Sequence, residues 1–133
     1  MLKYMLDTHI CTVTVKNRPQ QMREAFNRHH GQFCISSIGL MDLIRGAEKP
    51  AAPERNLSVV EGFAALLEVL PYDEMAAGHT GQLRAELARG VTPIPPYDQL
   101  IADHARSRGL ILVTNNRHEF DRVPGLRVED WTA

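Results

Sequence analysis

The stretch "YMLDTHI" at residues 4–10 decides the fold, because a short apolar run ends there at a carboxylate. Tyr4, Met5 and Leu6 close a run at residues 2–6 of the kind that forms a strand buried on both faces. Asp7 follows at once, where such a strand ends. A carboxylate at the edge of a core is costly unless it is compensated, so we expect partners for Asp7 nearby.

Further apolar runs follow along the chain, each joined to a segment with helical periodicity. Strands are expected at residues 2–6, 33–36, 68–72 and 110–114, with a short edge strand in the tail at 126–131. Helices are expected at residues 19–30, 37–49, 73–89 and 98–108, and a further helix begins at Pro53 and includes the apolar stripe at 57–67. Pro19 marks the start of the first helix, and Gly31, Gly90 and Gly109 mark the ends of the helices before them. A loop is expected at residues 91–97. Strands alternating with helices predict an α/β fold with three layers. Its central, mainly parallel sheet of four to five strands is covered by helices on both faces, in one domain at 1–133.

One segment stays open between helix and strand. Residues 8–17, "THICTVTVKN", are rich in β-branched side chains, which favour a strand. Asp7 or Thr8 could instead cap a short helix.

Composition narrows the class of protein. The chain has 133 residues, 44% hydrophobic and 23% charged, which is ordinary for a globular domain. No apolar run reaches the length of a membrane span, and the N-terminus lacks the apolar stretch of a secretion signal, so a cytoplasmic protein is expected. Cys11 and Cys34 lie in apolar segments and are expected as buried free thiols. A net charge of −1 gives no overall basic field for nucleic acid.

In parallel sheets, ligands bind beyond the carboxyl ends of the strands, which is where partners for Asp7 are sought. Asp42 lies in the helix after the second strand, and Asp98 opens the helix before the fourth. Thr114, Asn116 and Glu119 follow the fourth strand. Each acid alone has a structural explanation, as a helix cap or a solvated helix residue. Their joint placement favours a shared site. Asp103 is excluded, because five helical residues after Asp98 turn it to another side.

Several stretches, taken in order, resemble the PIN domain. "YMLDTHI" is similar to its opening, "SIGLMDLIRG" (37–46) to its Ser-x-x-x-x-Glu-Leu-x-x-Gly helix, and "YDQLIADHARSRGLILVTNN" (97–116) to its Asp-containing helix and next strand. The resemblance continues through "EFDRVPGLRVEDW" (119–131) and is greatest to VapC toxins of type II toxin–antitoxin systems, particularly the enterobacterial type.

The chain departs from the family pattern at three positions. The family usually has Asn where this chain has His9, and Glu where it has Asp42. Many PIN domains have an acid at the position of Asn116, whereas VapC relatives are acidic at the position of Glu119. Asp7 and Asp98 match directly.

The resemblance implies a Mg²⁺-dependent endoribonuclease, with Mn²⁺ as an alternative ion. Asp7, Asp42, Asp98 and Glu119 are then the candidate catalytic acids, with Asp7 and Asp98 as metal ligands and the other two holding metal-bound water or a second ion. Clustered carboxylates repel one another, and a divalent cation removes that conflict. Candidate supporting residues are Thr8, Ser37, Thr114 and Asn116, and candidate RNA-binding residues are Arg45 and Arg117.

The family also implies partners: a VapB antitoxin, a tRNA substrate cut in the anticodon loop of initiator tRNA, a homodimer, and operator DNA bound only through the antitoxin. The alternative is a PIN-fold module that binds RNA or antitoxin but lost efficient chemistry through Asp42 and His9.

Overall fold

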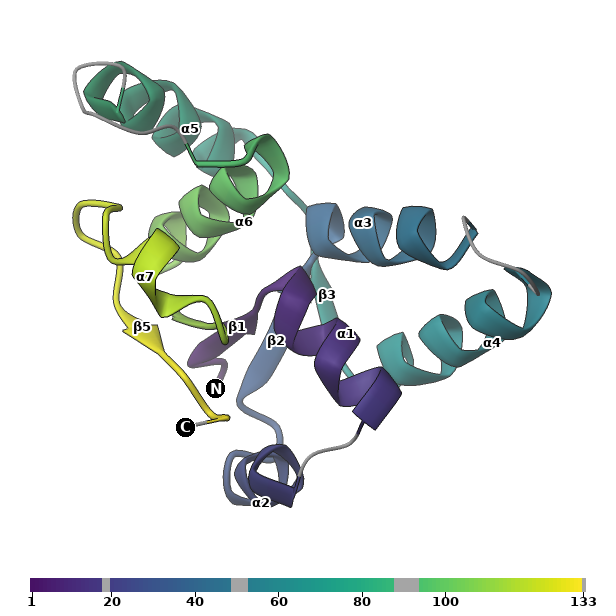
Figure 1. Ribbon diagram of the computed structural model, residues 1–133. Helices are drawn as coiled ribbons and strands as arrows, with labels where there is room; N and C mark the ends of the chain where they lie inside the picture. Colours follow the sequence, from purple (N-terminus) through teal and green to yellow (C-terminus); the bar gives the residue numbers. More distant parts are fainter. Residues whose placement is uncertain (18–19, 49–52, 88–93, 133) are drawn as a thin grey trace.

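The computed structural model describes residues 1–17, 20–48, 53–87 and 94–132, and shows a parallel sheet between two layers of helices (Figure 1). Within these ranges the strand order is β3–β2–β1–β4–β5, and every pair is parallel. The strands are β1 (Tyr4–Leu6), β2 (Phe33–Ser36), β3 (Glu68–Leu70), β4 (Ile111–Val113) and β5 (Val128–Glu129). The helices are α1 (Thr8–Asn17), α2 (Gln20–Arg28), α3 (Ser37–Glu48), α4 (Pro53–Ala64), α5 (Glu74–Leu87), α6 (Pro96–Ser107) and α7 (Arg117–Phe120).

The two layers follow from the alternation of side chains along β1. Tyr4 and Leu6 face a core formed with α1 to α4, whereas Met5 between them faces a core formed with α5, α6 and α7. In Figure 1, α3 and α4 accordingly lie to one side of the sheet and α5 and α6 to the other. The predicted three-layer α/β fold is confirmed.

The open segment at residues 8–17 is a helix, α1. Asp7 caps it, because its Oδ1 accepts a hydrogen bond from the Ile10 backbone N–H at 2.7 Å. The hydroxyls of Thr12 and Thr14 donate to the carbonyls of Thr8 and Ile10, one turn earlier. The β-branched threonines are therefore satisfied within the helix, which removes the main argument for a strand.

Other boundaries differ from expectation by a few residues. Helix α6 begins at Pro96 rather than Asp98, because proline suits the first helical position and places Asp98 in the first turn. Helix α7 was not expected, since four residues carry too little periodicity to detect. The edge strand in the tail is confirmed as β5. The expectations at Pro19, 49, 88–90 and 91–93 lie outside the described residues.

The strand order places the site. From β1 the chain builds outward to β2 and β3 on one side, and later to β4 and β5 on the other. The order therefore reverses between β1 and β4, and open α/β sheets bind ligands at the carboxyl edge of such a point. Cys11 and Cys34 are buried free thiols, as expected. No helix in the described ranges is both long and apolar enough to traverse a bilayer.

Candidate active site

Asp7 lies at the carboxyl end of β1 and is fully buried. Its backbone N–H donates to the Val113 carbonyl of β4, which fixes it at the reversal of strand order. One carboxylate oxygen caps α1 through Ile10, and the other accepts a hydrogen bond from the Thr114 hydroxyl at 2.5 Å. These two donors hold the carboxylate of Asp7 in one orientation. They also offset part of the cost of burying its negative charge.

The loop after β4 continues the network. Thr114 Oγ1 accepts from the Asn116 backbone N–H at 2.9 Å, and Asn116 Nδ2 donates to Glu119 Oε2 at 2.6 Å. Asn116 therefore orients Glu119 and is not an acid in its own right. The other oxygen of Glu119, Oε1, is buried and has no donor among the described residues.

Asp98 reaches the same site from the first turn of α6. Its side chain is 9% exposed and lies 4.0 Å from Nε2 of His9, which is 57% exposed. Asp98 also faces Glu119 closely enough that the two carboxyl groups can share a proton. The structure thus brings Asp7, Asp98 and Glu119 together, with His9 at the solvent side. His9 entered the sequence argument only as a departure, although its position two residues after Asp7, at the start of α1, could have indicated the site.

Burial and mutual repulsion disfavour the negatively charged form of the carboxyl groups at this site. Burial raises the pKa of Asp7 from 3.8 to about 6, against the opposing hydrogen bonds from Thr114 and Ile10. Burial, followed by the hydrogen bond and charge of Asp98, raises the pKa of Glu119 to about 7. The charge of Asp98 raises the pKa of both groups further, so the site favours a proton or a cation.

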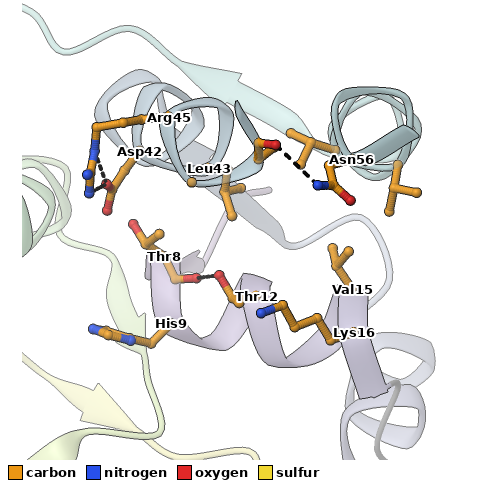
Figure 2. Close-up of a pocket in the computed structure, with 13 residues that line it drawn as sticks. Thr8, His9, Thr12, Val15, Lys16, Asp42, Leu43, Arg45 and Asn56 are labelled. Atoms are coloured by element: carbon orange, nitrogen blue, oxygen red, sulfur yellow. Dashed lines mark hydrogen bonds and ion pairs between the residues drawn. The ribbon is translucent and has the colours of Figure 1, made fainter. Parts of the chain in front are cut away.

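Asp42 is placed differently from the other acids. It lies on α3, and its Oδ1 accepts two hydrogen bonds from Arg45, at 2.6 Å from Nη2 and 3.2 Å from Nε. Arg45 in turn lies 5.5 Å above the ring of Tyr97. Asp42 lines a hollow with Thr8 and His9, so it borders the site while its charge is already compensated (Figure 2).

The remaining candidates lie at the margins. Ser37 Oγ accepts a hydrogen bond from the Tyr72 backbone N–H, which ties the end of β3 to the start of α3. Thr8 Oγ1 is buried with no hydrogen-bond partner in the described part of the chain. Arg117 pairs with Asp121 at 3.5 Å on the exposed surface of α7. Asp103 is buried, with Thr80, Arg106 and Arg84 acting on its charge, and it stands apart from Asp98 as expected.

Across the described ranges, no three His, Cys, Asp or Glu side chains lie close enough together to form a preformed metal cage. Mg²⁺ does not require one, because it keeps several waters and takes one or two carboxylates. The raised pKa values of Asp7 and Glu119, with Asp98 acting on both, are properties of a site that takes up a cation. The donor set therefore fits a hard divalent ion.

A family model described as "PIN domain" matches residues 4–126. The chain is also 65% identical over 131 residues to the "tRNA(fMet)-specific endonuclease VapC" of Salmonella typhimurium, covering 98% of this chain and 99% of that protein. The chain belongs to the VapC family of PIN-domain proteins. A second VapC of the same description, from Shigella flexneri, is 63% identical over 132 residues and covers 99% of this chain and 100% of that protein.

Solved structures of VapC relatives share the fold throughout. The VapC-family chain described here superposes on a chain of the DNA-bound VapBC crystal structure from Salmonella typhimurium with a TM-score of 0.96, covering 98% of this chain and 99% of that one. It superposes on a chain of VapBC2 from Rickettsia felis, bound to a promoter DNA fragment, with a TM-score of 0.93 at 34% identity, covering 98% and 99% of the two chains.

Proposed function

We propose that this VapC-family protein is a divalent-metal-dependent endoribonuclease toxin that acts on tRNA. The observation that carries the proposal is the meeting of two buried acids, Asp7 and Asp98, with the half-buried Glu119 at the carboxyl edge of the sheet. The proposed substrate is initiator tRNA, cut in its anticodon loop, in keeping with the tRNA(fMet)-specific relatives at 65% and 63% identity. The cytoplasm, where tRNA is used, is the proposed place of action.

In this proposal, Asp7 and Asp98 hold the ion directly. A bound Mg²⁺ or Mn²⁺ would polarise the scissile phosphate and favour the deprotonated form of the attacking water. Thr114 locks the carboxylate of Asp7 in place, and Asn116 does the same for Glu119. Burial and Asp98 raise the pKa of Glu119 to about 7, so near neutral pH Glu119 would accept a proton from water at the site. Asp42 acts from the margin, through water or a second ion.

The proposed partner is a VapB-type antitoxin, which also links the toxin to operator DNA. A hollow of about 590 Å³ between α1, α2 and α4 supports this part of the proposal. Three aromatic side chains line it, and Leu66 at its rim is 82% exposed. An exposed apolar rim around an aromatic hollow suits an apolar helix or extended segment of a partner. A homodimer is proposed as well, by analogy with the family.

One observation favours the alternative, a binding module with weakened chemistry. The ion pair with Arg45 occupies the carboxylate of Asp42, so Asp42 contributes less negative charge than a free acid. The alternative predicts RNA binding with little or no cleavage.

An RNA cleavage assay in which the new RNA ends are mapped distinguishes the ribonuclease from the binding module. Purified protein is incubated with total tRNA and Mg²⁺, and new ends are located by sequencing. We expect cuts in the anticodon loop of initiator tRNA, lost in Asp98→Asn and retained in Glu61→Gln, which removes an exposed carboxylate from α4. Cleavage by Asp98→Asn at the rate of the parent would refute the proposal, and binding without cleavage by the parent would favour the module.

A further inference from the structure

A second hollow, of about 480 Å³, opens directly beside the carboxylate site, between α1, α3 and α4 (Figure 2). Its mouth carries His9 and Asp42, both at the margin of the catalytic carboxylates. Its volume falls in the range of pockets that hold small organic ligands, which run from about 300 to 1,000 Å³. A bound molecule that spans the site and the hollow would therefore have one unit at the carboxylates and the next unit here.

One wall is the polar side of α1. Thr8, Thr12 and Lys16 follow one another at intervals of four residues, so they form a row on one face of the helix. The row begins next to Asp7 and ends roughly 12 Å away, at 1.5 Å of rise per residue. Figure 2 shows this row facing α3 and α4 across the hollow. This row of polar side chains therefore leads away from the carboxylate site along one face of α1.

The opposite wall is mainly apolar. Leu43 of α3 and Val59 and Val60 of α4 line it, with Val15 of α1 beside them. Asn56 closes the far end, where its amide donates to the Ala47 carbonyl at 3.3 Å. The hollow therefore joins a flat aliphatic surface to a polar row, a combination suited to a ligand with an uncharged ring and a charged group.

The charges of the hollow favour an anion. Two cations, Lys16 and Arg45, line it with one carboxylate, Asp42, which Arg45 already neutralises. Lys16 has no ion pair with any acid in the described ranges. The whole chain carries a net charge of −1, so a positive concave surface next to the catalytic acids is a local feature.

We propose that this hollow binds the nucleotide next to the scissile phosphate, with its base against the aliphatic wall and its phosphate near Lys16. The inference rests on the proposed ribonuclease function, and it assigns Lys16 and Gly46 to substrate binding. Loop nucleotides suit it, because their unstacked bases can be splayed out into protein pockets. Phosphate contacts by lysine position the strand, and apolar contacts hold the base.

Two substitutions test the hollow by different means. Lys16→Gln removes the cation and keeps a polar side chain. Gly46→Leu fills the hollow from α3, and a Cβ at Gly46 meets no heavy atom within 4 Å, so the side chain starts into open space. The matched controls are Lys3→Gln at the start of β1, and Gly78→Leu on α5, where a Cβ also meets nothing within 4 Å.

Binding is measured by fluorescence anisotropy with a labelled anticodon stem–loop of initiator tRNA. All variants carry Asp7→Asn, so that the probe stays intact, and the salt concentration is varied. We expect Lys16→Gln to weaken binding about tenfold and to reduce the slope of log K against log[salt] by about 0.7, the value for one lost phosphate contact on a single strand. Gly46→Leu should weaken binding about tenfold with the slope unchanged, because it removes volume and no charge.

The controls should bind like the Asp7→Asn parent. If Lys16→Gln and Gly46→Leu also match it in affinity and slope, the nucleotide pocket is wrong while the ribonuclease proposal stands. If both variants bind RNA normally but lose affinity for the cognate antitoxin, the hollow serves the protein partner and the inference is overturned. If the parent does not bind the stem–loop at all, both proposals fail.

Discussion

Asp7→Asn should stabilise the metal-free protein at neutral pH while it abolishes cleavage. Asp7 is completely buried, and burial raises its pKa from 3.8 to about 6. An asparagine of the same shape can still accept from the Ile10 N–H, and its amide can donate to Thr114 Oγ1 in a bond of reversed direction, so both neighbours keep a partner at this position. What disappears is the penalty of holding a negative charge in the core.

The size and sign of the effect follow from linkage. Because the folded-state pKa is raised, the folded protein binds more protons than the unfolded chain between pH 3.8 and 6, and the contribution of Asp7 to stability falls as pH rises. Above pH 6 the full penalty applies, and a rise from 3.8 to about 6 corresponds to about 3 kcal/mol. Below pH 3.8 the carboxyl is protonated in both states, and the penalty vanishes.

Urea unfolding in EDTA measures this difference. The gain in free energy of unfolding from Asp7→Asn should be about 2 to 3 kcal/mol at pH 7.5 and small at pH 4. Glu61→Gln, at an exposed site on α4, should show no such dependence. Excess Mg²⁺ at pH 7.5 should narrow the gap, because the ion binds the parent's Asp7 and not the amide. An effect of Asp7→Asn that is equal at both pH values would refute the reasoning.

Three further predictions concern the acids and the partner. Asp42→Asn should lower kcat/KM about 10- to 100-fold, the usual cost of losing a group that acts on a metal ion through water. Asp42→Glu should preserve or raise kcat/KM, and parental activity of Asp42→Asn across a Mg²⁺ titration would remove Asp42 from the site. Because Glu119 has a pKa of about 7, cleavage by the parent should rise with pH between 6 and 8, and Glu119→Gln should flatten that limb in a pH–rate profile. Leu66→Asp should weaken antitoxin binding by roughly 10- to 100-fold in calorimetry, since a buried Leu contributes about 1.5 to 3 kcal/mol. The control Met75→Asp, on α5, should leave antitoxin binding unchanged. Equal losses of affinity from both variants would argue against the aromatic hollow as the docking surface.

The fold was predictable because the strands are apolar runs with clear boundaries. β1, β2 and β4 lie within the expected ranges, and their parallel pairing follows from the helices between them. Residues 8–17 were ambiguous, because local propensity favours a strand. The structure forms a helix there, in which Asp7 caps the first turn and the hydroxyls of Thr12 and Thr14 bond to carbonyls one turn earlier.

The site was predictable in its residues more than in its contacts. Sequence reasoning selected Asp7, Asp98 and Glu119, which the structure brings together. The pairing of Asp42 with Arg45 was not foreseen, although a spacing of three residues on one helix makes such a pair possible. Ser37 was expected to support the site, whereas its hydroxyl binds the backbone after β3. The contact of Ser37 joins segments 35 residues apart, and no local sequence pattern records such packing.

The proposed mechanism requires a divalent ion at Asp7 and Asp98 to cut RNA, and removal of metal is the sharpest test of that requirement. Purified protein is treated with EDTA, exchanged into metal-free buffer, and assayed on an initiator tRNA transcript before and after Mg²⁺ or Mn²⁺ is restored. We expect no cleavage without metal, recovery on adding either ion, and no recovery in Asp7→Asn or Asp98→Asn. Undiminished cleavage by the parent in excess EDTA would contradict it.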